Sequence, residues 1–309
     1  MKNNVEITYG DWRASVNVGR GANCIRLIND RYGASILREP PATDELDNPY
    51  LYGMPILFPV NRIEGGRFAF EGREYVFPIN EPRTNCHLHG ELHRTPFLVL
   101  QKTENSVLCR FFAEKGEYLS FPHAFSITTE YTLLDDGLYH TVTVENRSKE
   151  NMPVFLGFHT TFNICFLRGS APEDIRAYAG VTTEYERLMD VNYLPTGVKP
   201  PFDEISTALS QGALSPAARK ISRHYRGEGI MSLTDLKNKV RVVYEADEKL
   251  GFRLIYSGGE EGYICLEPQN CLANCPNSPF SRREAGFDYV TPSTAKTYRS
   301  KIYLEEISL

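Results

Sequence analysis

The chain has 309 residues, of which 41% are hydrophobic and 24% charged, as in globular proteins and unlike disordered or fibrous ones. Large β-sandwiches reach this length as one domain, so residues 1–309 are interpreted as a single domain. The formal net charge is −5 and no stretch of Lys and Arg forms a basic stripe. This charge pattern argues against nucleic acid as a partner.

Membrane and export signals are not found in the sequence. No run approaches 18 apolar residues, and the first residues lack the apolar segment of a signal peptide. We therefore expect a cytoplasmic protein without a membrane partner. Its seven Cys residues are expected to be reduced. The spacing of Cys265, Cys271 and Cys275 does not match the paired cysteines of zinc sites.

Strand patterns follow one another along the chain. Residues 67–77 alternate aromatic and polar side chains about Glu71-Gly72, and residues 125–144 predict a second hairpin about Asp136-Gly137. Later strands are predicted at 240–244, 252–256, 263–266 and 296–304. Helical patterns are short, at 172–175 and 204–218. The chain is therefore predicted to be all-β, an antiparallel sandwich or barrel with few short helices.

The segment 154–167 is predicted to be an extended strand with two different faces. Apolar side chains fall on one face, whereas Gly157, His159, Thr161 and Asn163 fall on the other. A polar row in an otherwise apolar strand is typical of a pocket wall. The alternative is a core histidine that is hydrogen-bonded to the backbone.

Glu267 follows an apolar strand, and Pro268 is expected to interrupt the ladder directly after it. A carboxylate at such a position is a candidate general base, because partial burial raises its pKa toward neutral pH. A solvated glutamate at a strand end is the alternative interpretation.

His87 and His89 are two residues apart and would share one face of a strand, with Gly90 leaving room for a ligand. His-x-His is also a metal-binding pattern, so a cupin-like metal centre with His159 and Glu267 is an alternative. The acidic residue Glu91 is misplaced for that pattern, and no metal or other cofactor is expected. Arg62 could bind sugar oxygens through its planar fork, or it could be a surface residue that pairs with Glu64 or Glu71.

Six segments, taken in order, resemble the aldose 1-epimerase (galactose mutarotase) family. They are residues 53–68 with Asn61-Arg62, Phe77-Pro-Ile-Asn80, His87-Leu-His-Gly90, His159-Thr-Thr-Phe-Asn163, a middle loop at 194–203, and Leu266-Glu-Pro-Gln269. The resemblance covers most of the chain and implies a large antiparallel β-sandwich, the galactose mutarotase-like supersandwich.

The resemblance also implies an activity and a partner. The chain would be an isomerase that interconverts the α and β anomers of a hexose or related small-molecule sugar. Glu267 would remove the proton of the anomeric hydroxyl, and His159 would protonate the ring oxygen. Arg62 and His89 would contact the substrate, and Asn163 and Gln269 are placed with them as binding residues.

One departure from the family pattern concerns substrate binding. Many relatives have an Asp before the late strands to hold sugar hydroxyls, whereas this chain has Ser222 or Arg223 there. Arg223 would permit an anionic sugar, and Arg83 and Arg94 would permit a hexose phosphate, although surface salt bridges are the ordinary role of such residues. A non-catalytic sugar-binding or sensing protein of the same fold remains the competing hypothesis.

Overall fold

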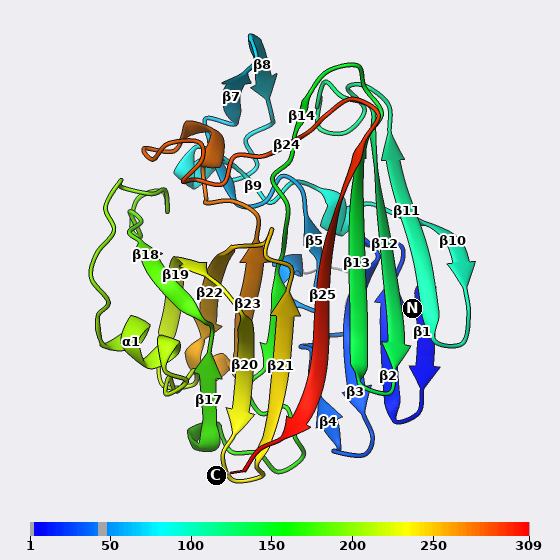
Figure 1. Cartoon of the computed structure of the whole chain (residues 1–309), viewed down its shortest axis with the longest axis vertical. Coiled ribbons are helices and arrows are strands. Elements are labelled where there is room, and N and C mark those ends of the chain that lie inside the picture. The colour runs from blue at the N-terminus through cyan, green and yellow to red at the C-terminus, as the bar shows by residue number, and fades with distance from the viewer. Residues whose placement is uncertain (1–2, 43–47, 309) are drawn as a thin grey trace.

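The computed structural model describes residues 3–42 and 48–308 and is built almost entirely from strands (Figure 1). Its largest sheet has eight antiparallel strands drawn from both halves of the chain. In spatial order these are β10 (Leu98–Lys102), β11 (Ser106–Ala113), β12 (Phe125–Leu134), β13 (Gly137–Asn146), β25 (Ala295–Glu306), β21 (Val240–Ala246), β20 (Ile230–Asp235) and β17 (Ile175–Tyr178).

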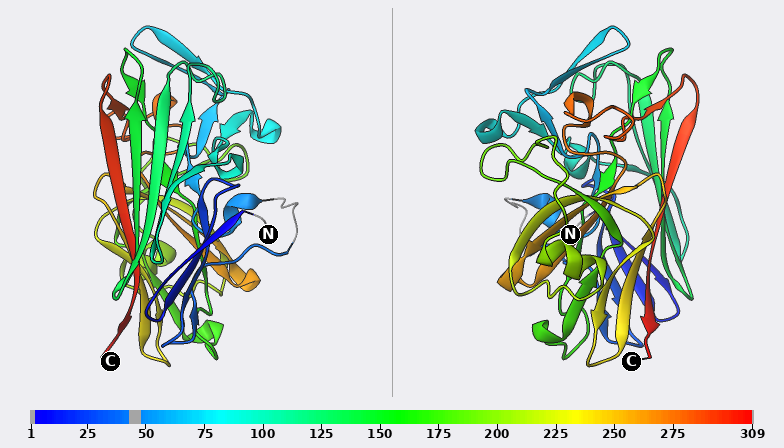
Figure 2. Two further views of the ribbon diagram at one scale, coloured as in Figure 1. Left: turned by 90° about the vertical axis from the view of Figure 1, so that its right-hand side faces the viewer. Right: turned by 60° about the vertical axis from the view of Figure 1, so that its left-hand side comes forward.

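A seven-stranded sheet lies behind this layer in the view of Figure 1. In spatial order it contains β18 (Val181–Tyr185), β19 (Lys220–Gly227), β22 (Phe252–Gly258), β23 (Tyr263–Gln269), β15 (Gly157–Phe158) and β5 (Ile56–Leu57), and β16 (Thr160–Asn163) also pairs with β23. A four-stranded sheet comes from the N-terminal segment: β1 (Asn4–Tyr9), β2 (Trp12–Asn17), β3 (Asn23–Asn29) and β4 (Ala34–Ser35). Figure 2 shows it edge-on, across from the strands β11–β13.

The hydrophobic core lies between these layers. The hydroxyls of Thr160 on β16 and Tyr244 on β21 are 2.9 Å apart, and the ring of Phe162 lies 5.6 Å from that of Tyr244. The ring of His140 on β13 lies 4.8 Å from that of Phe158 on β15. All of these side chains are buried, so the inner face of the seven-stranded sheet packs on the eight-stranded sheet and leaves the other face for a site.

Short elements complete the fold. Three two-stranded ribbons pair β6 (Arg62–Glu64) with β9 (Cys86–Leu88), β7 (Arg67–Phe70) with β8 (Arg73–Val76), and β14 (Met152–Pro153) with β24 (Tyr289–Val290). The α-helix α1 (Glu204–Ser210) begins at Asp203, whose side chain accepts a hydrogen bond from the Ser206 amide. Single 3₁₀ turns lie at Pro49–Leu51, Pro82–Thr84, Leu92–Arg94, Pro172–Asp174, Gly259–Glu261 and Cys275–Asn277. Within the described ranges no helix is long and apolar enough to span a bilayer.

The predicted all-β class, both hairpins and the four later strands are confirmed. Two local expectations are wrong. Segment 154–167 is not one strand, because the ladder is interrupted at His159, whose amide donates to Pro55. Pro268 does not end its ladder: it pairs with Arg253, and β23 continues to Gln269. A proline is tolerated there because each edge of an antiparallel strand needs donors only from alternate residues.

Candidate active site

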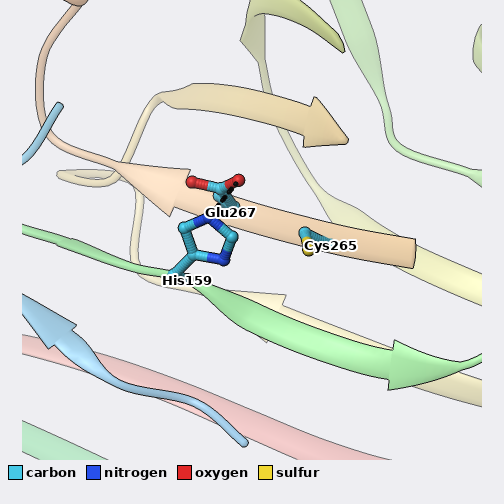
Figure 3. Close-up of side chains that lie close together, drawn as sticks. All are labelled: His159, Cys265 and Glu267. Carbon is cyan, nitrogen blue, oxygen red and sulfur yellow. Dashed lines mark ion pairs between the residues drawn. The ribbon is translucent and has the colours of Figure 1, made fainter. Parts of the chain in front are cut away.

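The register of the seven-stranded sheet brings the two predicted catalytic residues together. Gly157 pairs with Gln269, and Thr160 pairs with Leu266, so the intervening His159 lies opposite Glu267. Directly opposed residues on antiparallel strands present their side chains on the same face. His159 Nε2 lies 3.2 Å from Glu267 Oε1, and Figure 3 shows the two side chains meeting from adjacent strands.

Burial governs the protonation of this pair. Glu267 is fully buried and His159 is only 6% exposed. Burial raises the pKa of Glu267 to about 8, against the opposing effects of the Gln269 hydrogen bond and of Arg187 and Arg62. Burial also lowers the pKa of His159 to about 4. Between these values the pair holds one proton, which lies on the Glu267 carboxyl group.

A chain of hydrogen bonds connects the pair to neighbouring side chains and orients it. Gln269 Nε2 donates to Glu267 Oε2 at 3.1 Å, and Gln269 Oε1 accepts from Asn61 Nδ2 at 3.2 Å. The backbone amide of Asn61 donates to His89 Nδ1 at 3.2 Å. Because Nδ1 of His89 is an acceptor, its proton sits on Nε2, which becomes a donor. Asn61 and His89 both have positive φ, and such strain is typical of functional sites.

Arg62 is held on the other side of the cavity by Glu81. Its Nε and Nη2 donate to the two Glu81 carboxylate oxygens at 2.6 and 2.7 Å. Burial opposes ionisation of Glu81, but its hydrogen bonds with Arg62 and Thr84 lower its pKa overall. The Arg62 guanidinium also lies 4.4 Å from the centre of the Tyr193 ring. Arg62 therefore lines the cavity, and its ion-pair partner is Glu81 instead of the expected Glu64 or Glu71.

These groups surround a cavity of about 430 Å³, within the range of small-molecule sites. It is lined by Asn48, Tyr50, Leu51, Asn61, Arg62, Glu81, Arg83, Leu88, His89, His159, Arg187, Met189, Tyr193, Ser222, Leu254, Tyr256 and Glu267. The Tyr50 ring lies 5.0 Å from the His89 ring and 6.0 Å from the His159 ring. The arrangement offers an acid, a base, hydrogen-bond donors and aromatic faces around a polar molecule.

Comparison with known proteins shows which family the chain belongs to. Residues 10–283 match the family model described as aldose 1-epimerase. The chain belongs to the aldose 1-epimerase family. A galactose mutarotase-like protein from Clostridium acetobutylicum has the same fold, with a TM-score of 0.91, 29% identity and coverage of 98% of this chain and 95% of that one. Galactose 1-epimerase from Lactobacillus acidophilus, at 15% identity and a TM-score of 0.72, shares the fold over 98% of this chain and 94% of its own.

Curated relatives match over different lengths. The uncharacterized protein YihR of Escherichia coli is 24% identical over 96% of this chain and 90% of its own length. Galactose mutarotase from Rattus norvegicus is 30% identical over 50% of this chain and 44% of its own length. The match to the uncharacterized protein YphB of Escherichia coli covers 35% of this chain and only 36% of that protein.

Two residues expected to bind substrate do not line the cavity of this aldose 1-epimerase family member. Asn163 donates its side-chain amide to the backbone carbonyls of Ser35 and Leu37, because this segment runs along the edge of β16 and pairs with it. Gln269 is fully buried and contacts Glu267 instead. The structure therefore places Gln269 behind the catalytic pair and Asn163 away from it.

The cavity wall also departs from expectation where the family's Asp is missing. Ser222 lines the cavity, but Arg223 faces the other side of β19, where it pairs with Glu184 and Asp203. Arg83 lines the cavity, and its Nη2 donates to the Tyr193 hydroxyl. Arg94 is not one of the described residues that line the cavity. The cation nearest to Ser222 in the cavity is Arg187, which no sequence motif singled out.

The residues that could bind a metal in the structure differ from those expected for a cupin-like centre. His87 Nδ1 lies 2.7 Å from the Pro78 carbonyl oxygen and its ring stacks on Phe77, so His87 does not converge with His89. His159, Cys265 and Glu267 have potential ligand atoms within 4.8 Å of one another (Figure 3). Burial raises the pKa of the Cys265 thiol strongly, which disfavours the thiolate that a metal would need.

Other residues of the site were missed from the sequence because their roles depend on distant partners. Asn61 connects Gln269 to His89, the Tyr50 ring lies at a tilt near His89 and His159, and Glu81 neutralises Arg62. Only Asn61 had a sequence signal, as the neighbour of Arg62 in the Asn-Arg segment.

Proposed function

We propose that this protein is an aldose 1-epimerase that interconverts the α and β anomers of an aldose by acid-base ring opening. The observation that carries the proposal is the buried His159–Glu267 pair in the cavity, whose nitrogen and oxygen lie 3.2 Å apart. Membership in the family supports the same activity.

The reaction needs one base and one acid at the two oxygens of the anomeric centre. In the reactive form the single proton of the pair has moved from Glu267 to His159. The ionised Glu267 then takes the proton of the O1 hydroxyl while the C1–O5 bond breaks. The protonated His159 gives its proton to O5, which leaves an open-chain aldehyde. After rotation about the C1–C2 bond, O5 attacks the other face of the aldehyde, and the two protons return. Each proton transfer contributes roughly 10²- to 10⁴-fold to the rate.

The surrounding residues have distinct tasks in this scheme. His89 donates from Nε2 to a sugar oxygen, since its Nδ1 is engaged by the Asn61 amide. Arg62, fixed by Glu81, donates its remaining N–H groups to a hydroxyl. Gln269 holds the Glu267 carboxylate in place and is a positioning residue that does not touch the sugar.

Anomer exchange measured by NMR saturation transfer tests the proposal. The wild-type protein is expected to accelerate exchange of at least one aldose, and E267Q and H159Q are each expected to lower kcat by 10²-fold or more. E260Q, at an exposed turn, removes a carboxylate outside the site and serves as the control. Saturable binding of a sugar without accelerated exchange would instead identify the non-catalytic sugar-binding protein.

A further inference from the structure

Arg187 is a buried cation that faces the cavity and has no carboxylate partner among the described residues. Its exposed fraction is 7%, and it belongs to the cavity lining. Arg187 lies two residues after the end of β18, where it forms an isolated bridge with Pro195. Arg187 Nη2 donates to the Ser222 hydroxyl at 2.9 Å.

The other arginines near the cavity show what is unusual about Arg187. Arg62 is paired with Glu81, and Arg223 is paired with Glu184 and Asp203. Arg83 also lines the cavity, and among the described residues it has no ion pair, but it is exposed to solvent whereas Arg187 is buried. In the described part of the chain, no carboxylate lies within 4.0 Å of the Arg187 guanidinium. Of its five N–H donors, one is used by Ser222, so the fork retains donors for a ligand.

The charge of Arg187 is not neutralised by the catalytic pair either. Burial lowers the pKa of Arg187 to about 10, so the guanidinium stays charged at neutral pH. The carboxyl group of Glu267 is largely protonated below its pKa of about 8. A buried, uncompensated charge is costly, and a ligand that supplies the opposite charge removes that cost.

We propose that the substrate is an anionic aldose, with a carboxylate or phosphate group that Arg187 binds on the side of the sugar away from the anomeric carbon. The inference rests on the proposed function, because it names the substrate class of the same site. A carboxylate or phosphate accepts two parallel N–H bonds from a guanidinium, whereas a hydroxyl would leave its charge uncompensated.

The position of Arg187 agrees with a distal anionic group. Ser222, its partner, lies two strands from Glu267, since β19 is followed by β22 and β23. Ser222 pairs with Tyr256, which pairs with Cys265, two residues from Glu267 along β23. The Cα atoms of Ser222 and Glu267 are thus roughly 12 Å apart, from about 4.8 Å per strand and 3.3 Å per residue. Side chains from both ends reach inward and leave room for one pyranose.

The test compares wild-type anomer exchange for three matched sugars: glucose, glucuronic acid and glucose 6-phosphate, with the galactose series in parallel. At least one anionic sugar is expected to have a kcat/KM ten or more times that of its neutral parent. The R187Q variant is expected to reduce this ratio to near one, and R187K to an intermediate value because it keeps the charge but loses the fork.

The control and the contrary outcomes use the same measurement, the ratio of kcat/KM for an anionic sugar to that for its neutral parent. R241Q removes an arginine that pairs with Glu305 on the eight-stranded sheet, and it should leave the anionic-to-neutral ratio as in the wild type. The inference is overturned if the wild type prefers the neutral sugars, or if R187Q keeps the preference. If R187Q does not fold, the wild-type ratio alone decides.

Failure of the proposed function gives a different result. If no sugar exchanges faster with the protein, calorimetric titration with glucuronic acid and glucose 6-phosphate still measures binding. Binding of either that R187Q weakens tenfold or more supports the inference while refuting catalysis. Absence of binding by both anionic sugars overturns the inference. Accelerated exchange of neutral sugars alone supports the proposed function and refutes the anionic substrate.

Discussion

Replacing Glu267 by Gln should stabilise the protein, and the gain should increase with pH. Glu267 has a pKa of about 8 in the folded chain and an ordinary value of 4.5 when unfolded. Between pH 4.5 and pH 8 the unfolded chain releases this proton while the folded chain keeps it, so the contribution of Glu267 to the free energy of unfolding falls as pH rises. The slope is about 1.4 kcal/mol per pH unit.

The magnitude follows from the same two pKa values. The stability contributed by the protonated carboxyl is fully present below about pH 4.5 and is lost by pH 8. The advantage of E267Q over the wild type should therefore grow by about 3 to 4 kcal/mol between pH 5 and pH 8. The Gln amide nearly matches the shape of the carboxyl group but cannot ionise, so it does not add the same pH dependence.

Urea unfolding at pH 5, 6, 7 and 8 measures this difference directly, with the midpoint and slope fitted for each variant. E260Q, at an exposed turn, is the matched control and should give a difference that changes by less than about 0.5 kcal/mol. The reasoning is refuted if the difference between E267Q and the wild type stays constant across these pH values. A constant difference would mean that Glu267 is ionised in the folded protein throughout.

Three further predictions follow from the same geometry. First, kcat/KM should decline above about pH 8, where the His159–Glu267 pair loses its single proton, and a rate that keeps rising to pH 9 would contradict this. Second, Q269L should lower kcat about tenfold and move that decline to higher pH, because the Gln269 hydrogen bond favours the ionised carboxylate; a merely structural role would leave the pH profile unchanged. Third, the wild-type free energy of unfolding should fall from pH 7 to pH 5, since histidines with folded pKa values of about 3 to 4 each cost about 2 kcal/mol at pH 5, which exceeds the opposing effect of Glu267; urea midpoints at the two pH values would show the decrease. These histidines are His93, His123, His140 and His159.

The sheet class was predictable because alternation and turn residues are local signals. The hairpins around Glu71-Gly72 and Asp136-Gly137 could be predicted from neighbouring residues alone. The break at His159 was not, since it depends on the Pro55 carbonyl, about 100 residues away in the sequence. The prediction that Pro268 ends its ladder was wrong for a related reason. Whether a proline ends a ladder depends on whether the neighbouring strand needs a backbone donor at that position.

Some residues of the candidate site could likewise be predicted from the sequence, and others could not. His159 and Glu267 could be picked out because polar groups in apolar strands are visible in sequence. Asn163 has the same visible pattern, yet the segment Ser35–Leu37 accepts its side-chain hydrogen bonds, and no local signal reports that contact. Arg223 was considered for the cavity and Arg187 was not, because the sequence does not say which of two strand faces meets the cavity.

The central claim is that the buried His159–Glu267 pair opens a sugar ring. Its most direct test is NMR anomer exchange at pH 7 with the wild type, E267Q and H159Q across neutral, acidic and phosphorylated aldoses. The account predicts accelerated exchange of at least one sugar, lowered by 10²-fold or more in each variant. Exchange at the wild-type rate in E267Q would contradict it.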